Sequence, residues 1–277
     1  MMAAKTQLTP DERLQLRERM NELSDRAEQR FKDAVQPIYG ASEFGEPEHI
    51  GSCILIDLQG MKVLLTAGHV IDGNKNTTLY VGGARTPVAI EAQFLGSTSQ
   101  GRARGNDRYD FAAAKLQADV ATLLGDKFVA QGDIVTGPTI PPRYLTALGY
   151  PNSKNSYSRA KGVLVPKMLP YSTNAQMSDE LANRYGESGK NHLFLGYGRY
   201  SRSQNGEKTN SIAPVGMSGG AVIDAGNIAD PKVFRGEMEP TPRLAGVTIE
   251  LWRKNQVLVA TSLHCIVPVL LRELPKT

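Results

Sequence analysis

The sequence predicts an all-β fold with one helix at each end of the chain. From residue 49 onward, short runs rich in Ile, Leu and Val alternate with clusters of Gly, Pro, Asn and Ser, which is typical of a β-sandwich or β-barrel. Apolar residues form 40% and charged residues 22% of the 277 residues, so a disordered, collagen-like or coiled-coil protein is excluded. At about 150 residues per domain, this length corresponds to one or two domains.

The first segment has the features of an amphipathic helix. Thr9, Pro10 and Glu12 provide an N-cap, a proline at the first helical position and an acid three residues after the cap. An apolar stripe at steps of three or four residues then runs to about Val35, where Pro37 follows and ends the helix. The helix either packs on the outside of the main domain or docks a partner protein. We therefore expect residues 1–40 to form a helical extension of a main domain at 41–277.

Strands follow in order along the rest of the chain. Residues 51–58 and 61–67 predict a tight hairpin around Gln59 and Gly60. Further strands are expected at 77–81, 88–95, 111–116, 144–149, 162–168, 193–197, 221–224, 244–252 and 256–262. Residues 264–274 indicate a closing helix. The polar stretches 97–108 and 152–211 predict long loops, the second with a short helix near 178–185.

Charge and cysteine content exclude several other classes of protein. The formal net charge of +4 is spread along the chain, and aromatic residues make up only 6%, so no basic and aromatic platform for nucleic acid is expected. No apolar run approaches the roughly 20 residues of a membrane span. Cys53 and Cys265 cannot form a disulfide framework, and the amino terminus lacks the pattern of a secretory signal. We therefore expect a cytoplasmic protein.

Three residues could carry nucleophilic chemistry. His69 follows an apolar strand, Asp110 directly precedes another, and Ser218 lies in a turn between glycines. Each has an ordinary alternative, since a lone histidine is often structural, an aspartate often begins a strand, and glycine-rich turns are common. Together they are more specific, because acyl transfer needs a serine, an imidazole that takes its proton and a carboxylate that orients the imidazole.

These motifs resemble those of the chymotrypsin/trypsin-like serine peptidases. The matching segments are Thr-Ala-Gly-His at 66–69, Asp-Phe-Ala at 110–112 and Gly-Met-Ser-Gly-Gly at 216–220. Residues 244–249 look like the family's Gly-Ile-Val strand, and Gly-Tyr-Pro at 149–151 looks like a turn of its bacterial branch. The resemblance covers about residues 50–275, which is all but the amino-terminal helix.

The resemblance implies two six-stranded antiparallel β-barrels, at about 41–135 and 136–277, with the active site in the crevice between them. His69 would act as base and then acid, Asp110 would orient it, and Ser218 would be the nucleophile. The backbone N–H groups of Gly216 and Ser218 would form the oxyanion hole. The implied substrate is a polypeptide, and no cofactor is implied.

Two residues depart from the family pattern, one at a disulfide position and one at the position of the zymogen ion pair. Val70 stands where secreted members carry a cysteine after the histidine, so Cys53 has no partner there and is expected to be a small buried apolar residue. Met217 replaces the aspartate that binds a new amino terminus in the family's zymogens. We therefore expect control by a partner, a ligand or loop ordering, with the amino-terminal helix as a possible attachment point.

Specificity is predicted from two segments. Ile212, six residues before Ser218, takes the place where trypsin has an aspartate, and Ala213 follows it. Ile249 and Leu251 could add apolar walls, which favours small or aliphatic residues before the scissile bond. As an alternative, Glu250 could face the cleft and restore a preference for basic residues.

The remaining candidates have ordinary interpretations. His49, His192 and His264 show no metal-ligand spacing with the cysteines, so no metal is expected. Arg102, Arg104 and Arg108 form either a solvated loop or a site for an acidic segment. The leading hypothesis is a bacterial-type serine endopeptidase, and the alternative is a non-proteolytic interaction module on the same fold.

Overall fold

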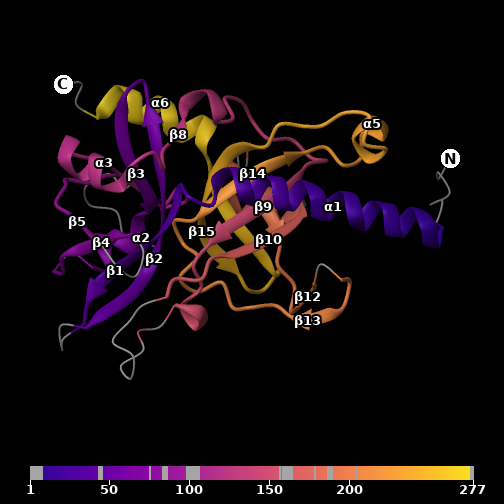
Figure 1. Cartoon of the computed structure of the whole chain (residues 1–277), viewed down its shortest axis with the longest axis horizontal. Helices are drawn as coiled ribbons and strands as arrows, with labels where there is room; N and C mark the ends of the chain where they lie inside the picture. The colour runs from indigo at the N-terminus through magenta and orange to yellow at the C-terminus, as the bar shows by residue number, and fades with distance from the viewer. Residues whose placement is uncertain are drawn as a thin grey trace.

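Two curled antiparallel sheets, each forming a half-barrel, lie side by side in the computed structural model (Figure 1). The structure describes residues 9–42, 46–74, 76–82, 87–97, 107–155, 157, 165–177, 179–185, 190–203 and 205–274. The arrangement confirms the predicted all-β fold, a chymotrypsin-like double barrel with an amino-terminal and a carboxy-terminal helix.

The first sheet has the strand order β5-β4-β1-β2-β3-β7-β6, and β8 pairs with β2 in parallel. Its strands are β1 (Val35–Ala41), β2 (Pro47–Leu58), β3 (Met61–Ala67), β4 (Leu79–Val81), β5 (Val88–Ile90), β6 (Leu95–Gly96), β7 (Phe111–Lys115) and β8 (Val129–Ala130). Residues 51–56 of β2 and 63–67 of β3 are buried, because the Ile, Leu and Val side chains among them fill the interior of this barrel.

The second sheet has the order β10-β9-β14-β15-β16-β11. Its strands are β9 (Tyr144–Gly149), β10 (Leu169–Asn174), β11 (His192–Gly196), β14 (Ala221–Gly226), β15 (Arg243–Trp252) and β16 (Val257–Ser262). A bridge between Ala175 and Leu195 joins the two edge strands, β10 and β11, and so curls the sheet toward a barrel. The strands β12 (Tyr200–Arg202) and β13 (Lys208–Asn210) form a separate ribbon.

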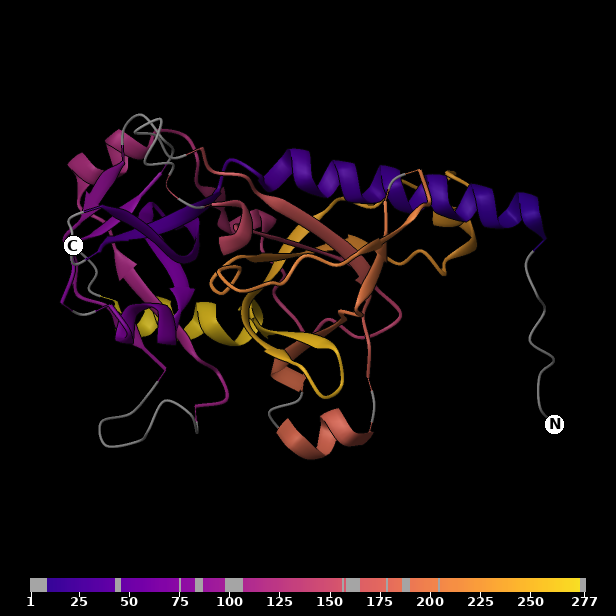
Figure 2. The ribbon, with the colours of Figure 1, turned by 90° about the horizontal axis from the view of Figure 1, so that it is seen from below.

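Helix α1 (Pro10–Phe31) runs along the second sheet (Figure 2). The predicted capping box is present, with Thr9 and Glu12 bonding to each other's backbone N–H. Leu23, Ala27 and Phe31 are buried, so the apolar stripe faces the core as predicted. The other helices are α2 (Gly68–Asp72), α3 (Ala118–Leu124), α4 (Asp179–Tyr185), α5 (Pro231–Phe234) and α6 (Leu263–Glu273), with 3-10 turns η2 (Gln131–Asp133) and η3 (Asn152–Lys154).

The strand predictions hold best where the apolar pattern is strong. Strands at 61–67 and 144–149 have the predicted bounds. The sequence placed 35–40 in a helical extension, whereas this segment forms most of β1 and pairs with β2 and β4. The single strand predicted at 88–95 is divided into β5 and β6. The strand predicted at 162–168 is wrong over residues 165–168, which form no strand, since β10 begins only at Leu169. Residues 162–164, together with Arg102 and Arg104, lie outside the described residues.

Within the described part of the chain, no helix is both long enough and apolar enough to cross a membrane.

Candidate active site

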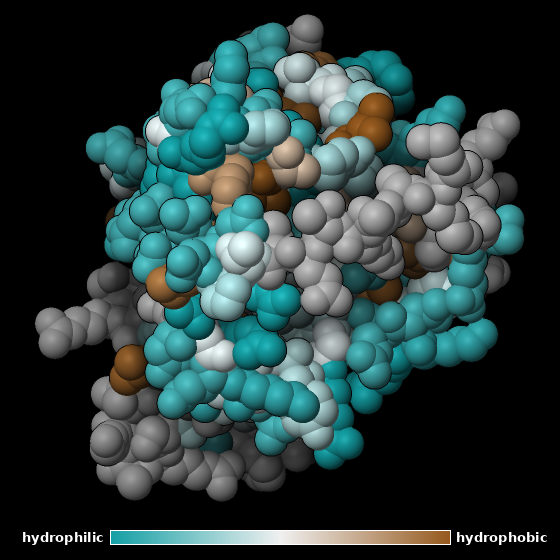
Figure 3. Space-filling view, turned by 90° about the vertical axis from the view of Figure 1, so that its right-hand side faces the viewer, coloured by the Kyte–Doolittle hydropathy of each residue, from teal (hydrophilic) through white to brown (hydrophobic). Residues whose placement is uncertain are grey.

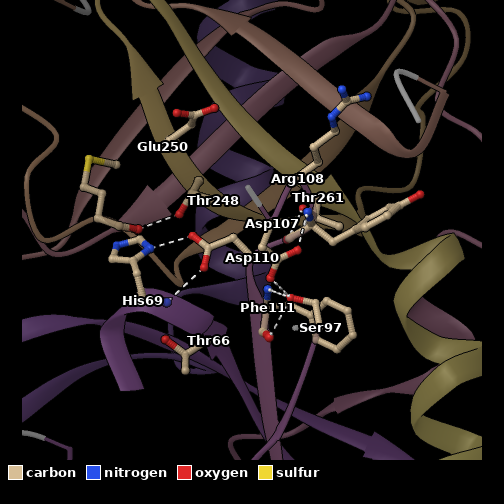
Figure 4. A network of polar contacts seen from close by, with 12 residues as sticks. Thr66, His69, Ser97, Asp107, Arg108, Asp110, Phe111, Thr248, Glu250 and Thr261 are labelled. Carbon is tan, nitrogen blue, oxygen red and sulfur yellow. Dashed lines mark hydrogen bonds and ion pairs between the residues drawn. The ribbon is translucent and has the colours of Figure 1, made fainter. Parts of the chain in front are cut away.

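The pairing of β3 with β7 brings His69 and Asp110 together. Thr66 lies opposite Ala112 and Ala67 opposite Phe111. Gly68, the next residue, donates its N–H to Asp110 O at 2.8 Å, so His69 follows directly beside Asp110. The His69 backbone N–H donates to Asp110 Oδ1 at 2.9 Å, and His69 Nδ1 lies 2.6 Å from Asp110 Oδ2 (Figure 4). The carboxylate therefore holds both the backbone and the ring of the histidine.

This contact also sets the chemistry of the imidazole. Asp110 is buried, whereas the His69 side chain is 43% exposed. An ionised carboxylate only accepts hydrogen bonds, so it favours the tautomer with the proton on Nδ1 and leaves Nε2 able to accept one. Asp110 has a φ of +41°, a left-handed conformation that is uncommon outside glycine and is often found at functional sites.

The turn that carries Ser218 is anchored through its carbonyl groups, since each one from residue 214 to residue 218 accepts a hydrogen bond. The donors are Met217 N–H to Pro214 O (2.9 Å), Asn152 N–H to Val215 O (2.8 Å), Ser52 Oγ to Gly216 O (2.9 Å), Gly220 N–H to Met217 O (2.9 Å) and Ser52 N–H to Ser218 O (2.8 Å). Ser52 belongs to β2, so the first barrel holds the turn of the second.

The N–H groups of Gly216 and Ser218 have no hydrogen-bond partner among the described residues, and the same holds for the N–H of Val215. The N–H of Gly219, in contrast, donates to Thr248 O at 2.7 Å. Gly216 has a φ of +93°, and a Cβ there would overlap Asn152 Oδ1, so this position requires glycine. A pair of converging, unpartnered N–H groups can stabilise an oxyanion.

His69, Asp110, Gly216 and Ser218 line one cleft of about 960 Å³. Among the contacts of the described residues there is no hydrogen bond between Ser218 Oγ and His69 Nε2. Catalytic hydrogen bonds of this kind are often long before substrate binds. The cleft thus brings together the groups that acyl transfer needs, with His69 from the first barrel and Ser218 from the second.

The walls of the cleft agree only partly with the predicted specificity residues. Ile249, Glu250 and Leu251 line it, but Ile212 and Ala213 do not. Ile212 lies instead along a groove beside α1, where its carbonyl accepts a hydrogen bond from Tyr197 Oη at 2.6 Å.

Glu250 does face the cleft, but its carboxylate has partners. Arg184 Nη2 lies 3.2 Å from Glu250 Oε1, and the Tyr185 hydroxyl donates to the same oxygen. Burial and the contact with Glu250 raise the pKa of Tyr185, so the tyrosine remains a donor. Both partners belong to α4, which agrees with the short helix that the sequence predicted near 178–185.

Several residues that shape the site were not predicted. Ser52, Asn152 and Thr248 contact the turn that carries Ser218, and nothing in the sequence distinguishes them from other polar residues. His49, expected to be ordinary, is buried with its Nδ1 at 2.7 Å from Asn152 Oδ1, and this burial lowers its pKa. Cys53 is fully buried as predicted, and burial raises the pKa of its thiol.

The other two histidines keep structural contacts. His192 Nε2 lies 2.7 Å from Arg108 O, and its ring packs between Tyr109 and Tyr185. His264 Nδ1 lies 2.8 Å from the Ser262 hydroxyl. Within the described ranges, no group of three His, Cys, Asp or Glu side chains is placed to hold a metal.

Comparison with known proteins gives a likeness of fold without a likeness of sequence. No family model and no curated protein matches the chain. A scabies mite inactivated protease paralogue, S-D1, aligns with a TM-score of 0.52 at 10% identity, over 89% of this chain and 95% of that one. A Glu endopeptidase in complex with MPD aligns at 0.49 and 14% identity, over 86% and 88% of the two chains. A structure from work on the Sesbania mosaic virus VPg protein gives 0.48 and 16%, over 87% and 98%. The likeness to the scabies mite protein shows the fold, and that fold is found in a protein described as inactivated.

Proposed function

We propose that this protein is a serine endopeptidase. The observation that carries the proposal is a single cleft that holds the His69–Asp110 pair, Ser218 and the two unpartnered N–H groups of Gly216 and Ser218. A structural histidine would need none of the other three features. The fold alone would not support activity, because folds host many functions.

The geometry supports a two-step acyl transfer. Ser218 Oγ attacks the carbonyl carbon of a peptide bond while His69 Nε2 takes the hydroxyl proton. The carbonyl oxygen becomes an oxyanion that accepts from Gly216 and Ser218 N–H, and Asp110 stabilises the imidazolium. His69 then donates its proton to the leaving amine, and an acyl-enzyme remains on Ser218. Water, deprotonated by His69, hydrolyses the ester and restores the free hydroxyl.

The substrate is a polypeptide with a small or aliphatic residue before the scissile bond. Ile249 and Leu251 supply apolar cleft walls, whereas the carboxylate of Glu250 is already held by Arg184 and Tyr185. A peptide-library profile dominated by aliphatic residues supports this preference. A profile dominated by Lys and Arg contradicts it and assigns the specificity to Glu250.

Regulation is proposed to depend on a partner or a ligand rather than on cleavage of a zymogen. Met217, at the place of the family's ion-pairing aspartate, is a buried apolar side chain. The proposed location is the bacterial cytoplasm, and the proposed partner site is the exposed face of α1. If a specific cleavage near Ile38 increases activity, this mode of regulation is wrong.

A Ser218→Ala variant tests the central proposal. Wild-type protein should react with a fluorophosphonate probe and cleave peptides, and Ser218→Ala should do neither. Heat-denatured wild type is the control, because probe reaction there would be unspecific. If the native protein neither reacts nor cleaves, the alternative of a non-proteolytic interaction module is favoured.

A further inference from the structure

The orientation of both candidate oxyanion donors is set from the opposite side of their peptide bonds. In a trans peptide unit, the C=O and the N–H point in opposite directions. The N–H of Ser218 shares its unit with Met217 O, and the N–H of Gly216 shares its unit with Val215 O. Whatever binds these two carbonyls therefore decides whether the two N–H groups point into the cleft.

Thr248, on β15, holds the first of these carbonyls. The hydroxyl of Thr248, which is labelled in Figure 4, donates to Met217 O. The same carbonyl also accepts from Gly220 N–H at 2.9 Å. Thr248 and Met217 are both buried. Each donor to a buried carbonyl stabilises it, so the Thr248 hydroxyl adds to the Gly220 contact and favours the peptide orientation in which Ser218 N–H points away from Thr248.

Asn152, at the start of η3, holds the second carbonyl. Its backbone N–H donates to Val215 O at 2.8 Å, and its side-chain Oδ1 lies against Gly216. His49 Nδ1 is 2.7 Å from this Oδ1 and fixes the carboxamide. The His49 ring is itself held, since it is 7% exposed and meets the Tyr39 ring edge-on with centroids 5.6 Å apart.

We propose that Thr248 and Asn152, with His49 behind Asn152, are positioning residues that keep the two oxyanion donors aimed into the cleft. This inference rests on the proposed function and extends it to residues outside the triad. None of the three is the nucleophile, base or carboxylate. Each acts through a backbone group of the turn, so its loss affects the transition state more than substrate binding.

The sharpest test is Thr248→Val, which removes the hydroxyl and keeps the shape. Loss of one oxyanion donor costs about 10² to 10³ in rate, so partial misalignment should lower kcat by about 10- to 100-fold with KM within about threefold. Thr248→Ser keeps the hydroxyl and should restore most of kcat. Thr146→Val is the matched control, because this buried hydroxyl bonds to Ser172 at 2.9 Å on the far side of the sheet from the turn's contacts.

Asn152 and His49, which act on the second carbonyl, are tested in the same way. Asn152→Ala keeps the backbone donor and removes only the carboxamide, and it should lower kcat about tenfold by the same mechanism. His49→Ala should have a similar effect, and the double variant should lose no more than either single variant, because the two side chains act in series. His49→Asn should retain activity, since an amide nitrogen replaces Nδ1.

The outcomes separate this inference from the proposed function. If wild type is active and Thr248→Val keeps its kcat, or if Thr146→Val loses as much, the positioning role is wrong. If wild type itself is inactive, the proposed function fails, and hydrogen exchange decides the inference. Faster exchange at the bonded N–H groups of Met217, Gly219 and Gly220 in Thr248→Val than in Thr146→Val supports positioning, and equal exchange overturns it.

Discussion

At the scale of single residues, Asp110 shows how one side chain can define a site. Its two oxygens have different partners, the backbone N–H and the ring Nδ1 of His69. An asparagine would keep one acceptor oxygen and present an NH₂ group to the other contact. It could then bond to the ring only if Nδ1 were unprotonated, which leaves the proton on Nε2.

We therefore predict that Asp110→Asn lowers kcat by about 10⁴-fold while the fold is kept, because the wrong histidine tautomer cannot accept the serine proton. Steady-state kinetics at neutral pH would measure this loss, and circular dichroism would check the fold. A fall of less than about tenfold would mean that Asp110 does not orient the base of this reaction.

The buried His49 gives a prediction about stability and pH. Burial lowers the pKa of folded His49 from its ordinary 6.5. Between that lowered value and 6.5, the unfolded chain binds a proton that the folded chain does not, so the free energy of unfolding decreases as pH falls through this window. The slope is at most about 1.4 kcal/mol per pH unit and disappears below the folded pKa.

His49→Asn should remove this contribution, because asparagine does not titrate. Urea unfolding from pH 8 to pH 5 would show a steeper loss of stability in wild type than in the variant. All other titrating groups, including His264, are common to both proteins, so the difference reports His49. Parallel curves would contradict a neutral, buried His49.

The sequence predicted the residues of the proposed triad, because short motifs surround each of them. It could not predict Ser52, Asn152 or Thr248, since their partners are backbone carbonyls that only the folded chain brings near. Such contacts leave no residue pattern. The same limit explains Ile212. Its distance in sequence from Ser218 predicted a place in the cleft, but in the folded chain its carbonyl is bonded to the Tyr197 hydroxyl outside the cleft lining.

At the scale of elements, α1 combines a packed part and an exposed part. Leu23 is fully buried, whereas Leu14, nine residues earlier in the same helix, is 45% exposed. Arg19 further ties the helix to the second barrel, with Nε donating to Val233 O at 2.8 Å. The helix thus packs on the main domain, and its proposed role in docking a partner concerns the exposed face.

On the side drawn in Figure 3 the surface is mostly hydrophilic, with hydrophobic residues in small separate groups.

We predict that Leu23→Ala lowers the free energy of unfolding by about 2 to 5 kcal/mol, because it leaves a cavity under α1. Leu14→Ala should change it by less than about 0.5 kcal/mol. Chemical denaturation of the two variants would measure the difference. Equal, small effects would show that α1 is not part of the cooperative unit.

The sequence did not predict strand β1, because Pro37 was interpreted as the end of the amino-terminal helix. Pro37 stops the helix, but it also lies within β1, opposite Ser52 of β2. A proline cannot donate to a strand ladder, so sequence patterns count it against a strand. The tertiary pairing of β1 with β2 and β4 overrides that local preference, and the first sheet therefore begins at Val35, before the predicted domain start.

At the scale of the whole molecule, the two barrels meet at the turn that carries Ser218. Ser52, on β2 of the first barrel, donates from Oγ to Gly216 O and from its N–H to Ser218 O, and its Oγ accepts from Tyr150 N–H at 2.9 Å. Its own carbonyl accepts from Thr66 Oγ1 at 2.7 Å. His69 and Ser218 belong to different barrels, so Ser52 helps to fix the position of one relative to the other.

Ser52→Ala should therefore affect stability and catalysis together. It leaves Gly216 O and Tyr150 N–H buried without their Ser52 partner, which should lower the free energy of unfolding by about 1 to 3 kcal/mol. It also removes the side-chain hydrogen bond that holds Gly216 O in the turn that carries Ser218. Ser262→Ala is the matched control, since this buried hydroxyl bonds to Ala245 O at 3.3 Å and to His264 Nδ1 at 2.8 Å, away from the turn. Both variants should be less stable than wild type, but only Ser52→Ala should lower kcat when measured well below its melting temperature. If the two variants lose stability alike and both keep kcat, the Ser52 contacts between the barrels stabilise the molecule without aligning its proposed active site.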